Sequence, residues 1–263
     1  MQIKIDNLSF QYAGAISALE NVSFDISAGE CVALAGHNGS GKSTLVKHLN
    51  GLLQPFAGKV FIEGNDTSTE SVARLAGHVA LLFQNPDDQI CKQSVWEEVA
   101  FGPKNLGYSA PRIDSLVNMS LYLFDVLDVR AKNPYDLGYS ERKRVAMASI
   151  VAMDTPVIVF DEPTAGLDSY EISLLINALR TLKNDNKTVI IISHDVDFVA
   201  ENCTRAICLA GGRQVFDGGV RELFSNQTLL ASCGLLPPQV VQLSNHFDMH
   251  HPALSPEEFV NEL

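Results

Sequence analysis

Short stretches of alternating apolar and polar residues occupy the chain from residue 2 to about residue 64. IKIDNLSFQY, NVSFDIS and KVFIEG alternate in this way and are bounded by Gly, Ala and Asn, which is typical of antiparallel strands joined by turns. Between them, CVALAG is a continuous apolar run, as in a strand that is buried on both faces. The pattern predicts an antiparallel β region beside one buried strand.

A helical pattern replaces this alternation between about residues 86 and 153. In SVWEEVAFGPKNLG, RIDSLVNMSLYLFDVLDV and SERKRVAMASIVAM, apolar residues lie three and four positions apart. From Pro156 onward, the β-branched runs VIVF, TVIIIS and RAICLA are separated by helical segments such as SYEISLLINALRTLK, as in a parallel sheet covered on both faces. We expect an α/β core with a helical insertion.

The tail contains two short helical patterns, LLASCGLLPPQVVQLSNHF and SPEEFVNEL, separated by a polar loop. We therefore expect one domain over residues 1–226, with a helical subdomain over about residues 88–153, and a C-terminal helical extension over residues 227–263. The loop contains HFDMHH, but a loop between two tail helices has no fixed ligand geometry, so no metal site is assigned there.

Composition and charge narrow the functional classes. The 263-residue chain is 46% hydrophobic and 19% charged, as folded globular proteins are. Its net charge of −12 is unfavourable for a surface that neutralises nucleic-acid phosphates. The start MQIKIDNLSF lacks the apolar segment of a signal peptide, no segment approaches about 18 apolar residues, and the five cysteines include no CxxC pair. We expect a chain that is not exported, crosses no membrane, binds no nucleic acid, and has neither a disulfide framework nor a zinc site.

The stretch GHNGSGKST, from Gly36 to Thr44, matches the phosphate-loop pattern G-x-x-x-x-G-K-[ST] and lies between a buried strand and a helical segment. Its glycines let successive N–H groups point inward as an anion nest at the positive end of the helix. Lys42 supplies a charge for the outer phosphates, and the Ser43 hydroxyl is placed to ligate Mg²⁺. The predicted nucleotide-binding residues of this loop are Asn38, Gly39, Ser40, Gly41, Lys42, Ser43 and Thr44.

The stretch PVIVFDEPTAGLD supplies the second half of such a site. Asp161 ends an apolar strand and is expected to hold the Mg²⁺ shell. Glu162 follows immediately, where a carboxylate can orient and polarise a water that attacks the terminal phosphate. The two motifs together predict hydrolysis of a magnesium nucleotide.

Along nearly its whole length, the chain resembles the ATP-binding subunits of ABC transporters. The resemblance implies the α/β fold of a P-loop NTPase, with a RecA-like parallel-sheet core, an antiparallel β-subdomain and a helical subdomain. It also implies ATP and Mg²⁺ as cofactors, and two ATP-bound chains that close face to face and reopen after hydrolysis.

Four further residues take their expected roles from this resemblance. Tyr12 in LSFQYAG matches an aromatic residue that stacks on adenine. Gln84 in LLFQNPDDQ matches a glutamine that contacts Mg²⁺ and water and reports the nucleotide state to a membrane partner. His194 in TVIIISHDVDFV matches a histidine that contacts the terminal phosphate, and Asp168 in AGLD matches a residue of the loop that crosses to a second cassette. The expected catalytic residues are then Glu162, His194 and Gln84, and the expected metal ligands are Ser43, Gln84 and Asp161.

The stretch LGYSE, from Leu137 to Glu141, occupies the place of the family signature L-S-G-G-Q and departs from it at four of five positions. The family motif places a serine hydroxyl and N–H groups at a helix N-terminus against the terminal phosphate of the other subunit. Here Gly138 replaces that serine, and Ser140 is placed as an N-cap or alternative hydroxyl donor. The residues expected to contact the partner's site are Gly138, Tyr139, Ser140, Glu141 and Asp168.

Glu141 brings a negative charge towards an anionic ligand. We expect Arg142, Lys143 or Arg144 to offset it. The variant is expected to dock but to support slower hydrolysis at the site that it completes. Such asymmetry favours a heterodimer, and a homodimer stays possible.

Within the family, FQNPDDQI, VWEEVAFGPKNLG and GLLPPQVV with SPEEFV resemble the ATPases of energy-coupling-factor importers, which take up vitamins or cobalt and nickel ions. The resemblance implies an integral-membrane coupling subunit, a substrate-binding membrane subunit, and a peripheral position on the cytoplasmic face of the cell membrane. The acidic residues near Gln84 either line a groove for a basic helix of the partner or form a solvated face: Asp87, Asp88, Glu97 and Glu98.

The alternative class is a soluble ABC ATPase. Chromosome-maintenance types need long coiled-coil heptads, which the sequence lacks, and translation types usually carry two cassettes and basic linkers. An ATPase of the iron-sulfur-assembly type stays open as the alternative, because it too has a single cassette.

Overall fold

Two sheets organise the structure, a computed structural model that describes residues 2–14, 16–249 and 251–262. One sheet is antiparallel, with strand order β2-β1-β4-β5. The other has the order β10-β9-β3-β8-β7-β6, and its neighbouring strands are parallel except for β10 beside β9. The strands are Ile3–Tyr12 (β1), Ile16–Ile26 (β2), Cys31–Ala35 (β3), Ala57–Ile62 (β4), Asn65–Asp66 (β5), Val79–Leu82 (β6), Val157–Asp161 (β7), Thr188–Ile192 (β8), Arg205–Ala210 (β9) and Arg213–Gly219 (β10).

The parallel strands of the second sheet are buried on both faces, as their continuous apolar runs predict, whereas the edge strand β10 is partly exposed. Along β7, Val157 and Val159 pack into a core shared with the antiparallel sheet and with α1 (Lys42–Leu49). The alternate residues Ile158 and Phe160 pack into the second core, among the helices on the other face. Successive side chains of a strand point to opposite faces, so one apolar run serves two cores. The predicted α/β fold with an antiparallel β region is confirmed.

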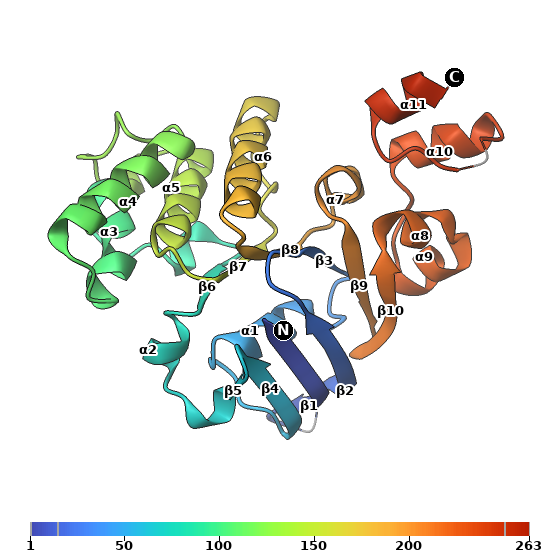
Figure 1. Ribbon diagram of the computed structural model, residues 1–263, viewed down its shortest axis with the longest axis horizontal. Helices are drawn as coiled ribbons and strands as arrows, with labels where there is room; N and C mark the ends of the chain where they lie inside the picture. Colours follow the sequence, from blue (N-terminus) through green and yellow to red (C-terminus); the bar gives the residue numbers. More distant parts are fainter. Residues whose placement is uncertain (1, 15, 250, 263) are drawn as a thin grey trace.

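Helices α3, α4 and α5 contact one another and form a group at one side of the molecule (Figure 1, green). They are Val95–Asn105 (α3), Ala110–Leu123 (α4) and Tyr139–Ala152 (α5). The prediction that FDVLDV continues α4 is wrong, because Asp125 has a φ of 53°, which ends the helix. Phe124 and Val126 are buried in the core without being helical, which explains the apolar pattern there.

The tail forms three helices where two were predicted. Gly234, with a φ of 67°, ends α9, and two prolines precede α10 and cannot continue a helix. Helix α9 packs on β9 (Figure 1, orange). Helix α10 contacts α11 (Figure 1, red). The remaining helices and 3₁₀ turns are Val72–Leu75 (α2), Ser169–Asn184 (α6), Val196–Asn202 (α7), Val220–Ser225 (α8), Gln227–Cys233 (α9), Gln239–His246 (α10), Pro256–Glu262 (α11), Thr67–Thr69 (η1), Pro86–Asp88 (η2) and Pro134–Asp136 (η3).

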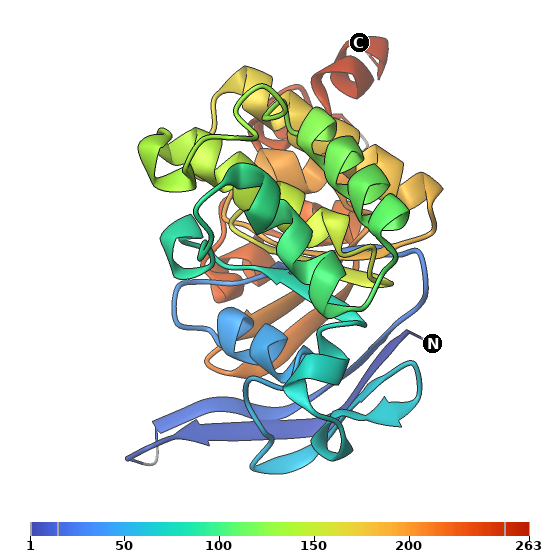
Figure 2. The same cartoon turned by 90° about the vertical axis from the view of Figure 1, so that its left-hand side faces the viewer.

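Figure 2 shows the antiparallel sheet at one end of the molecule and the C-terminal helices at the other. Between these ends, β3 leads into α1 through the predicted phosphate loop. In a parallel sheet, loops at the carboxyl ends of neighbouring strands form the usual ligand site. Within the described residues, no helix is long and apolar enough to cross a bilayer.

Candidate functional site

A cavity of about 390 Å³ lies where the carboxyl ends of β3, β7 and β8 meet. Ser40 alone among the predicted nucleotide, metal and catalytic residues does not line it, because its side chain is fully buried beneath the loop. Sequence reasoning did not anticipate Ser17, Ala18 and Ile192, which complete the wall. The cavity brings together Tyr12, Asn38, Gly39, Gly41, Lys42, Ser43, Thr44, Gln84, Asp161, Glu162 and His194.

The phosphate loop needs glycine where it begins. Gly36 has a φ of 137°, and a Cβ there would lie 2.1 Å from the carbonyl oxygen of Leu209. Only glycine allows this close packing of the loop against β9. The loop then enters α1 through Gly41, the N-cap, which has a φ of 105°. The first three residues of α1 line the cavity, so the positive end of the helix serves it.

Lys42 holds its charge within this loop. Its Nζ donates to the carbonyl oxygens of Gly36 (2.7 Å) and His37 (2.9 Å). Burial lowers the pKa of Lys42, and the carboxylates of Glu162 and Asp161 oppose that shift. An ammonium group held by two carbonyl oxygens at the cavity wall can exchange them for phosphate oxygens.

Ser43 and Asp161 converge as the metal hypothesis requires. The Ser43 hydroxyl donates to Asp161 Oδ2 over 2.9 Å, and Gln84 lines the same cavity. Asp161 is 8% exposed, and burial raises its pKa, while the Ser43 hydrogen bond and the Lys42 charge act in the opposite direction. A hydroxyl and a carboxylate at this separation fit Mg²⁺, which takes few protein ligands and leaves its other positions to phosphate and water.

Glu162 has the setting of a general base. Its Oε2 accepts the main-chain N–H of His194 at 3.3 Å, and His194 Nε2 lies 3.4 Å from Oε1 without the alignment of a hydrogen bond. Burial raises the pKa of Glu162, and the His194 charge opposes this. The residue has a φ of 51°, which costs a non-glycine residue about 1 kcal/mol or more. A carboxylate with a raised pKa and one oxygen that lacks a hydrogen bond within the described chain can accept a proton from water.

Tyr12 closes one side of the cavity. Its hydroxyl lies 3.1 Å from Thr44 Oγ1, and its ring meets Phe10 edge to face with centroids 4.9 Å apart. Phe10 in turn packs edge-on against His48 of α1. An aromatic face is thereby held at the cavity wall, which is the position that base stacking needs.

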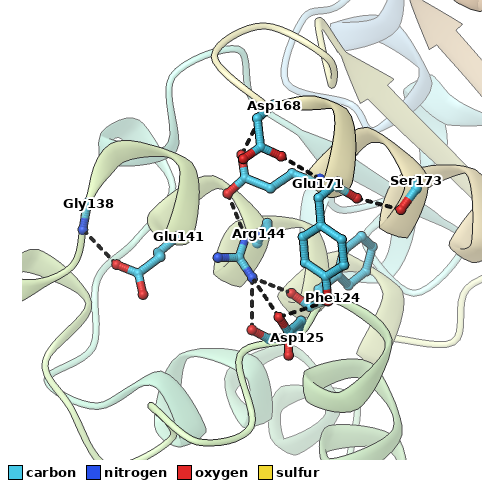
Figure 3. Close-up of polar contacts among 9 residues, drawn as sticks. Phe124, Asp125, Gly138, Glu141, Arg144, Asp168, Glu171 and Ser173 are labelled. Atoms are coloured by element: carbon cyan, nitrogen blue, oxygen red, sulfur yellow. Dashed lines mark hydrogen bonds and ion pairs between the residues drawn. The ribbon is translucent and has the colours of Figure 1, made fainter.

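The signature residues lie elsewhere, since none of Gly138, Tyr139, Ser140, Glu141 and Asp168 lines this cavity. Of the two roles considered for Ser140, the one as N-cap of α5 is wrong, while the one as alternative hydroxyl donor stays a prediction. The N-cap is Gly138, in an extended conformation, and the Glu141 carboxylate accepts its N–H at 3.1 Å (Figure 3). The preference of glutamate for the third helical position places Ser140 inside the first turn.

Within the part of the chain that the structure describes, none of the three basic residues after Glu141 forms an ion pair with its carboxylate, so the expected direct compensation is not seen. Arg142 pairs with Asp87 at 3.2 Å. Lys143 and Arg144 are buried and bind other parts of the chain. The carboxylate of Glu141 is occupied by the helix N-terminus itself, whose partial positive charge favours an anion.

Comparison with known proteins settles the family. A family model described as "ABC transporter" matches residues 19–165, which is more than half of the chain. The chain belongs to the ABC transporter family. Its fold is therefore that of an ATP-binding cassette of the ABC ATPase class.

Three similar proteins show how far the match to this cassette extends. The energy-coupling factor transporter ATP-binding protein EcfA2 of Clostridium tetani is 37% identical, over 92% of this chain and 88% of its own length. The structure of cbiO1 from Clostridium perfringens, described as part of the ABC transporter complex cbiONQ, is 28% identical, with a TM-score of 0.77 over 94% of this chain and 98% of that one. The cassette MJ0796, solved as a dimer in a post-hydrolysis state with ADP and Pi, is 27% identical, with a TM-score of 0.76 over 83% of this chain and 99% of its own.

Other relatives are much longer than this chain. It spans 39% of a putative ABC transporter ATP-binding protein of Methanosarcina acetivorans, with 38% identity over 92% of this chain. It also spans less than half of two further putative ABC transporter ATP-binding proteins.

The cassette has a second set of contacts that sequence reasoning missed. Gln89 joins the segment after β6 to α5: its Oε1 accepts the Phe83 N–H at 3.1 Å, and its Nε2 donates to Ala146 O at 3.1 Å and Ser149 Oγ at 3.0 Å. Gln89 is the last residue of the stretch FQNPDDQ, and nothing in the sequence indicates which groups its side chain binds.

Asp168 caps α6, at the end of the AGLD loop. Its carboxylate accepts the Glu171 N–H at 2.8 Å, and the Glu171 carboxylate accepts the Asp168 N–H at 3.0 Å. Glu171 also pairs with Arg144 of α5 at 3.1 Å, and Arg144 donates to the carbonyl oxygens of Phe124 and Asp125 (Figure 3). The loop with Asp168 and the helix behind the signature are thus tied by buried charges.

Lys143 makes a parallel connection from α5 to the loop after β7. Its Nζ donates to the carbonyl oxygens of Glu162 and Ala165, each at 2.6 Å. Burial lowers the pKa of Lys143 to about 8, against the attraction of the Glu162 and Asp161 carboxylates. The sequence places this lysine in the signature helix but does not indicate what it binds.

In the described part of the chain, no group of three or more His, Cys, Asp or Glu residues is arranged to hold a metal ion. His250 of the HFDMHH loop lies outside the described residues.

Proposed function

We propose that this cassette is the ATP-hydrolysing subunit of a membrane importer of the energy-coupling-factor type, which takes up vitamins or transition-metal ions. The observation that carries the proposal is the match along almost the full length of EcfA2 of Clostridium tetani. The similarity to cbiO1, part of a transporter complex, supports the same class over a similar span. We divide the chain into an ATPase domain, residues 1–226, with a helical subdomain over about 88–153, and an extension, residues 227–263.

The proposed chemistry follows from the cavity. Lys42 and the N–H groups of the loop hold the phosphates, Tyr12 stacks on adenine, and Glu162 takes a proton from the attacking water. Ser43, Asp161 and Gln84 would hold Mg²⁺, which neutralises charge on the phosphate oxygens when it is bound. His194, beside Glu162, contacts the terminal phosphate.

A second cassette completes each site in this proposal. The residues from Gly138 to Glu141 and Asp168 lie away from their own chain's cavity. We therefore assign them to the nucleotide of the other cassette, with a heterodimer favoured by the altered signature. Two ATP-bound cassettes close face to face and reopen after hydrolysis, which is the motion that drives transport.

An apolar groove supplies a docking place for the membrane subunit. A cavity of about 570 Å³ lies among α2, β6, α3 and α5, next to the segment that carries Gln84. Of the four acidic residues considered from the sequence, Glu98 lines this groove, and its buried carboxylate already accepts the N–H groups of Cys91 and Lys92. Asp87 pairs with Arg142. We infer that an amphipathic helix of an integral-membrane partner docks there by its apolar face, with the cassette peripheral on the cytoplasmic side.

Replacing Phe101 with glutamate is expected to break this docking. Phe101 lines the groove and is 39% exposed, so the substitution places a charge in the apolar contact without disturbing the core. Lys92 Nζ lies 3.9 Å from the centroid of the Phe101 ring and can pair with the new carboxylate, but burying even a paired charge in an apolar contact costs free energy. The yield of the co-purifying membrane subunit should therefore fall about tenfold. The measurement is affinity purification from detergent-solubilised membranes.

Tyr122→Glu is the matched control, because Tyr122 is 78% exposed on α4 and lies outside the groove. It should leave the yield unchanged, and both variants should keep ATP binding. Purely soluble scaffold partners for the unaltered chain would instead favour the alternative, a soluble ABC ATPase of the iron-sulfur-assembly type.

Restoring serine at Gly138 is expected to raise ATP hydrolysis at the partner's site about tenfold, because a hydrogen bond to a charged group contributes about 1.5–3 kcal/mol. The residue has space for it: a Cβ would meet only Glu141 Oε2, at 3.6 Å, and its φ of −62° suits any residue. Hydrolysis is measured in pairs of cassettes in which the chain with the changed Gly138 also carries Glu162→Gln. Only the partner's site then hydrolyses ATP. Gly138→Ala is the control, and an equal rise with alanine would contradict the assigned role.

A further inference from the structure

Lys143 lies near the N-terminus of α5 and is fully buried. A buried ammonium group is costly unless it is hydrogen-bonded, so its partners define what it does in the fold. Both short hydrogen bonds of its Nζ go to one loop, the segment between β7 and α6, at Glu162 O and Ala165 O. The side chain does not line the nucleotide cavity.

The main chain of Glu162 is held from two sides. Its N–H donates to the carbonyl oxygen of Ile192, the last residue of β8, at 2.8 Å, and its own carbonyl oxygen accepts from Lys143. Its backbone is in the left-handed region, which persists only where the surroundings enforce it. With both flanking peptide groups fixed, the direction in which the carboxylate leaves the backbone is fixed too.

We propose that Lys143 is a positioning residue for hydrolysis, which acts by holding the main chain of Glu162 so that its carboxylate reaches the attacking water. The inference rests on the proposed role of Glu162 as the general base. Because Lys143 does not line the nucleotide cavity, its loss affects turnover and leaves ATP affinity nearly intact.

Lys187 offers a matched control from the same chain. It is largely buried, and its Nζ donates to Asp154 O at 2.9 Å and Asp154 Oδ1 at 2.6 Å. It directly precedes β8, whereas Glu162 and Ile192 lie at the carboxyl ends of β7 and β8. Replacing Lys187 removes the hydrogen bonds of a buried lysine, as replacing Lys143 does, but leaves the loop that carries Glu162 unaltered.

The test compares Lys143→Met, Lys143→Arg and Lys187→Met in the full chain purified with its co-purifying subunits. Lys143→Met is expected to lower kcat by between about tenfold and 10²-fold, the scale of a small misplacement of a catalytic group, and to change the Kd for ATP by less than about threefold. Lys143→Arg keeps the charge and the donors, so it should lose less turnover than Lys143→Met. Lys187→Met should lower the melting temperature without lowering kcat.

A double-variant cycle with Glu162→Gln decides whether Lys143 acts through Glu162. When one residue acts through another, the second substitution adds almost nothing to the first. Lys143→Met should therefore reduce the residual turnover of Glu162→Gln by less than about twofold. If Lys143→Met unfolds, Lys143→Arg replaces it in the cycle. Lys143→Arg should then lower turnover by a smaller factor in the unaltered chain and should not lower it further in the Glu162→Gln variant.

Three results overturn the inference: additive losses in the cycle, a loss of ATP affinity as large as the loss of turnover, or a Lys187→Met variant that loses the same turnover. Failure of the proposed function gives a different result, in which Glu162→Gln alone leaves turnover unchanged or the unaltered complex hydrolyses no ATP.

Discussion

Replacing Glu162 with glutamine is expected to lower ATP turnover by about 10²-fold or more and to leave ATP binding in place. A positioned general base contributes about 10²–10⁴-fold, and an amide cannot accept the proton. The substitution keeps the size and the hydrogen-bonding oxygen of the side chain, so the bond from the His194 N–H can persist. Steady-state phosphate release measures turnover, and equilibrium binding of labelled ATP measures retention.

Glu222→Gln provides the control for this prediction. Glu222 is an exposed residue of α8 outside the cavity, and it carries the same change of charge. Its turnover should stay within about twofold of the unaltered chain, as expected for a surface substitution. Full activity in Glu162→Gln would remove Glu162 from the role of general base, whatever the control shows.

Replacing Lys42 with methionine is expected to weaken ATP binding on the order of 10²-fold, because each hydrogen bond to a charged group contributes about 1.5–3 kcal/mol. The substitution also removes the bonds to Gly36 O and His37 O, so the melting temperature should be compared. Titration with ATP in the presence of magnesium gives the affinity. Lys4→Met, an exposed lysine of β1, is the control and should bind ATP normally. Unchanged affinity in Lys42→Met would contradict the phosphate role.

The strands and the phosphate loop were predictable because their signals are local. An apolar run such as VIVF is stable as a strand buried between two cores. A glycine-rich turn between a buried strand and a helix commonly binds phosphate. Asp161 and Glu162 were found in the same way, at the end of such a run. The cavity that unites them with Tyr12 and Gln84 followed from the family resemblance, since those residues carry no local signal of their own.

Other features depended on contacts between distant segments. Helix α4 ends because Asp125 has a left-handed backbone conformation. Phe124 is buried although it is not helical, so its apolar side chain could not show where the helix ends. Ser140 looked like an N-cap by residue type, but the Glu141 carboxylate selects Gly138. The partners of Lys143 are 19 and 22 residues away, and no periodicity in the sequence points to them.

The central claim is that the loop from Gly36 to Thr44, with Asp161, binds a magnesium nucleotide. Its most direct test is a titration of the purified full chain, with and without its partner subunits, with ATP at about millimolar magnesium. The account predicts saturable binding of ATP that weakens when magnesium is chelated. An absence of ATP binding in both preparations, with the chain folded, would contradict it.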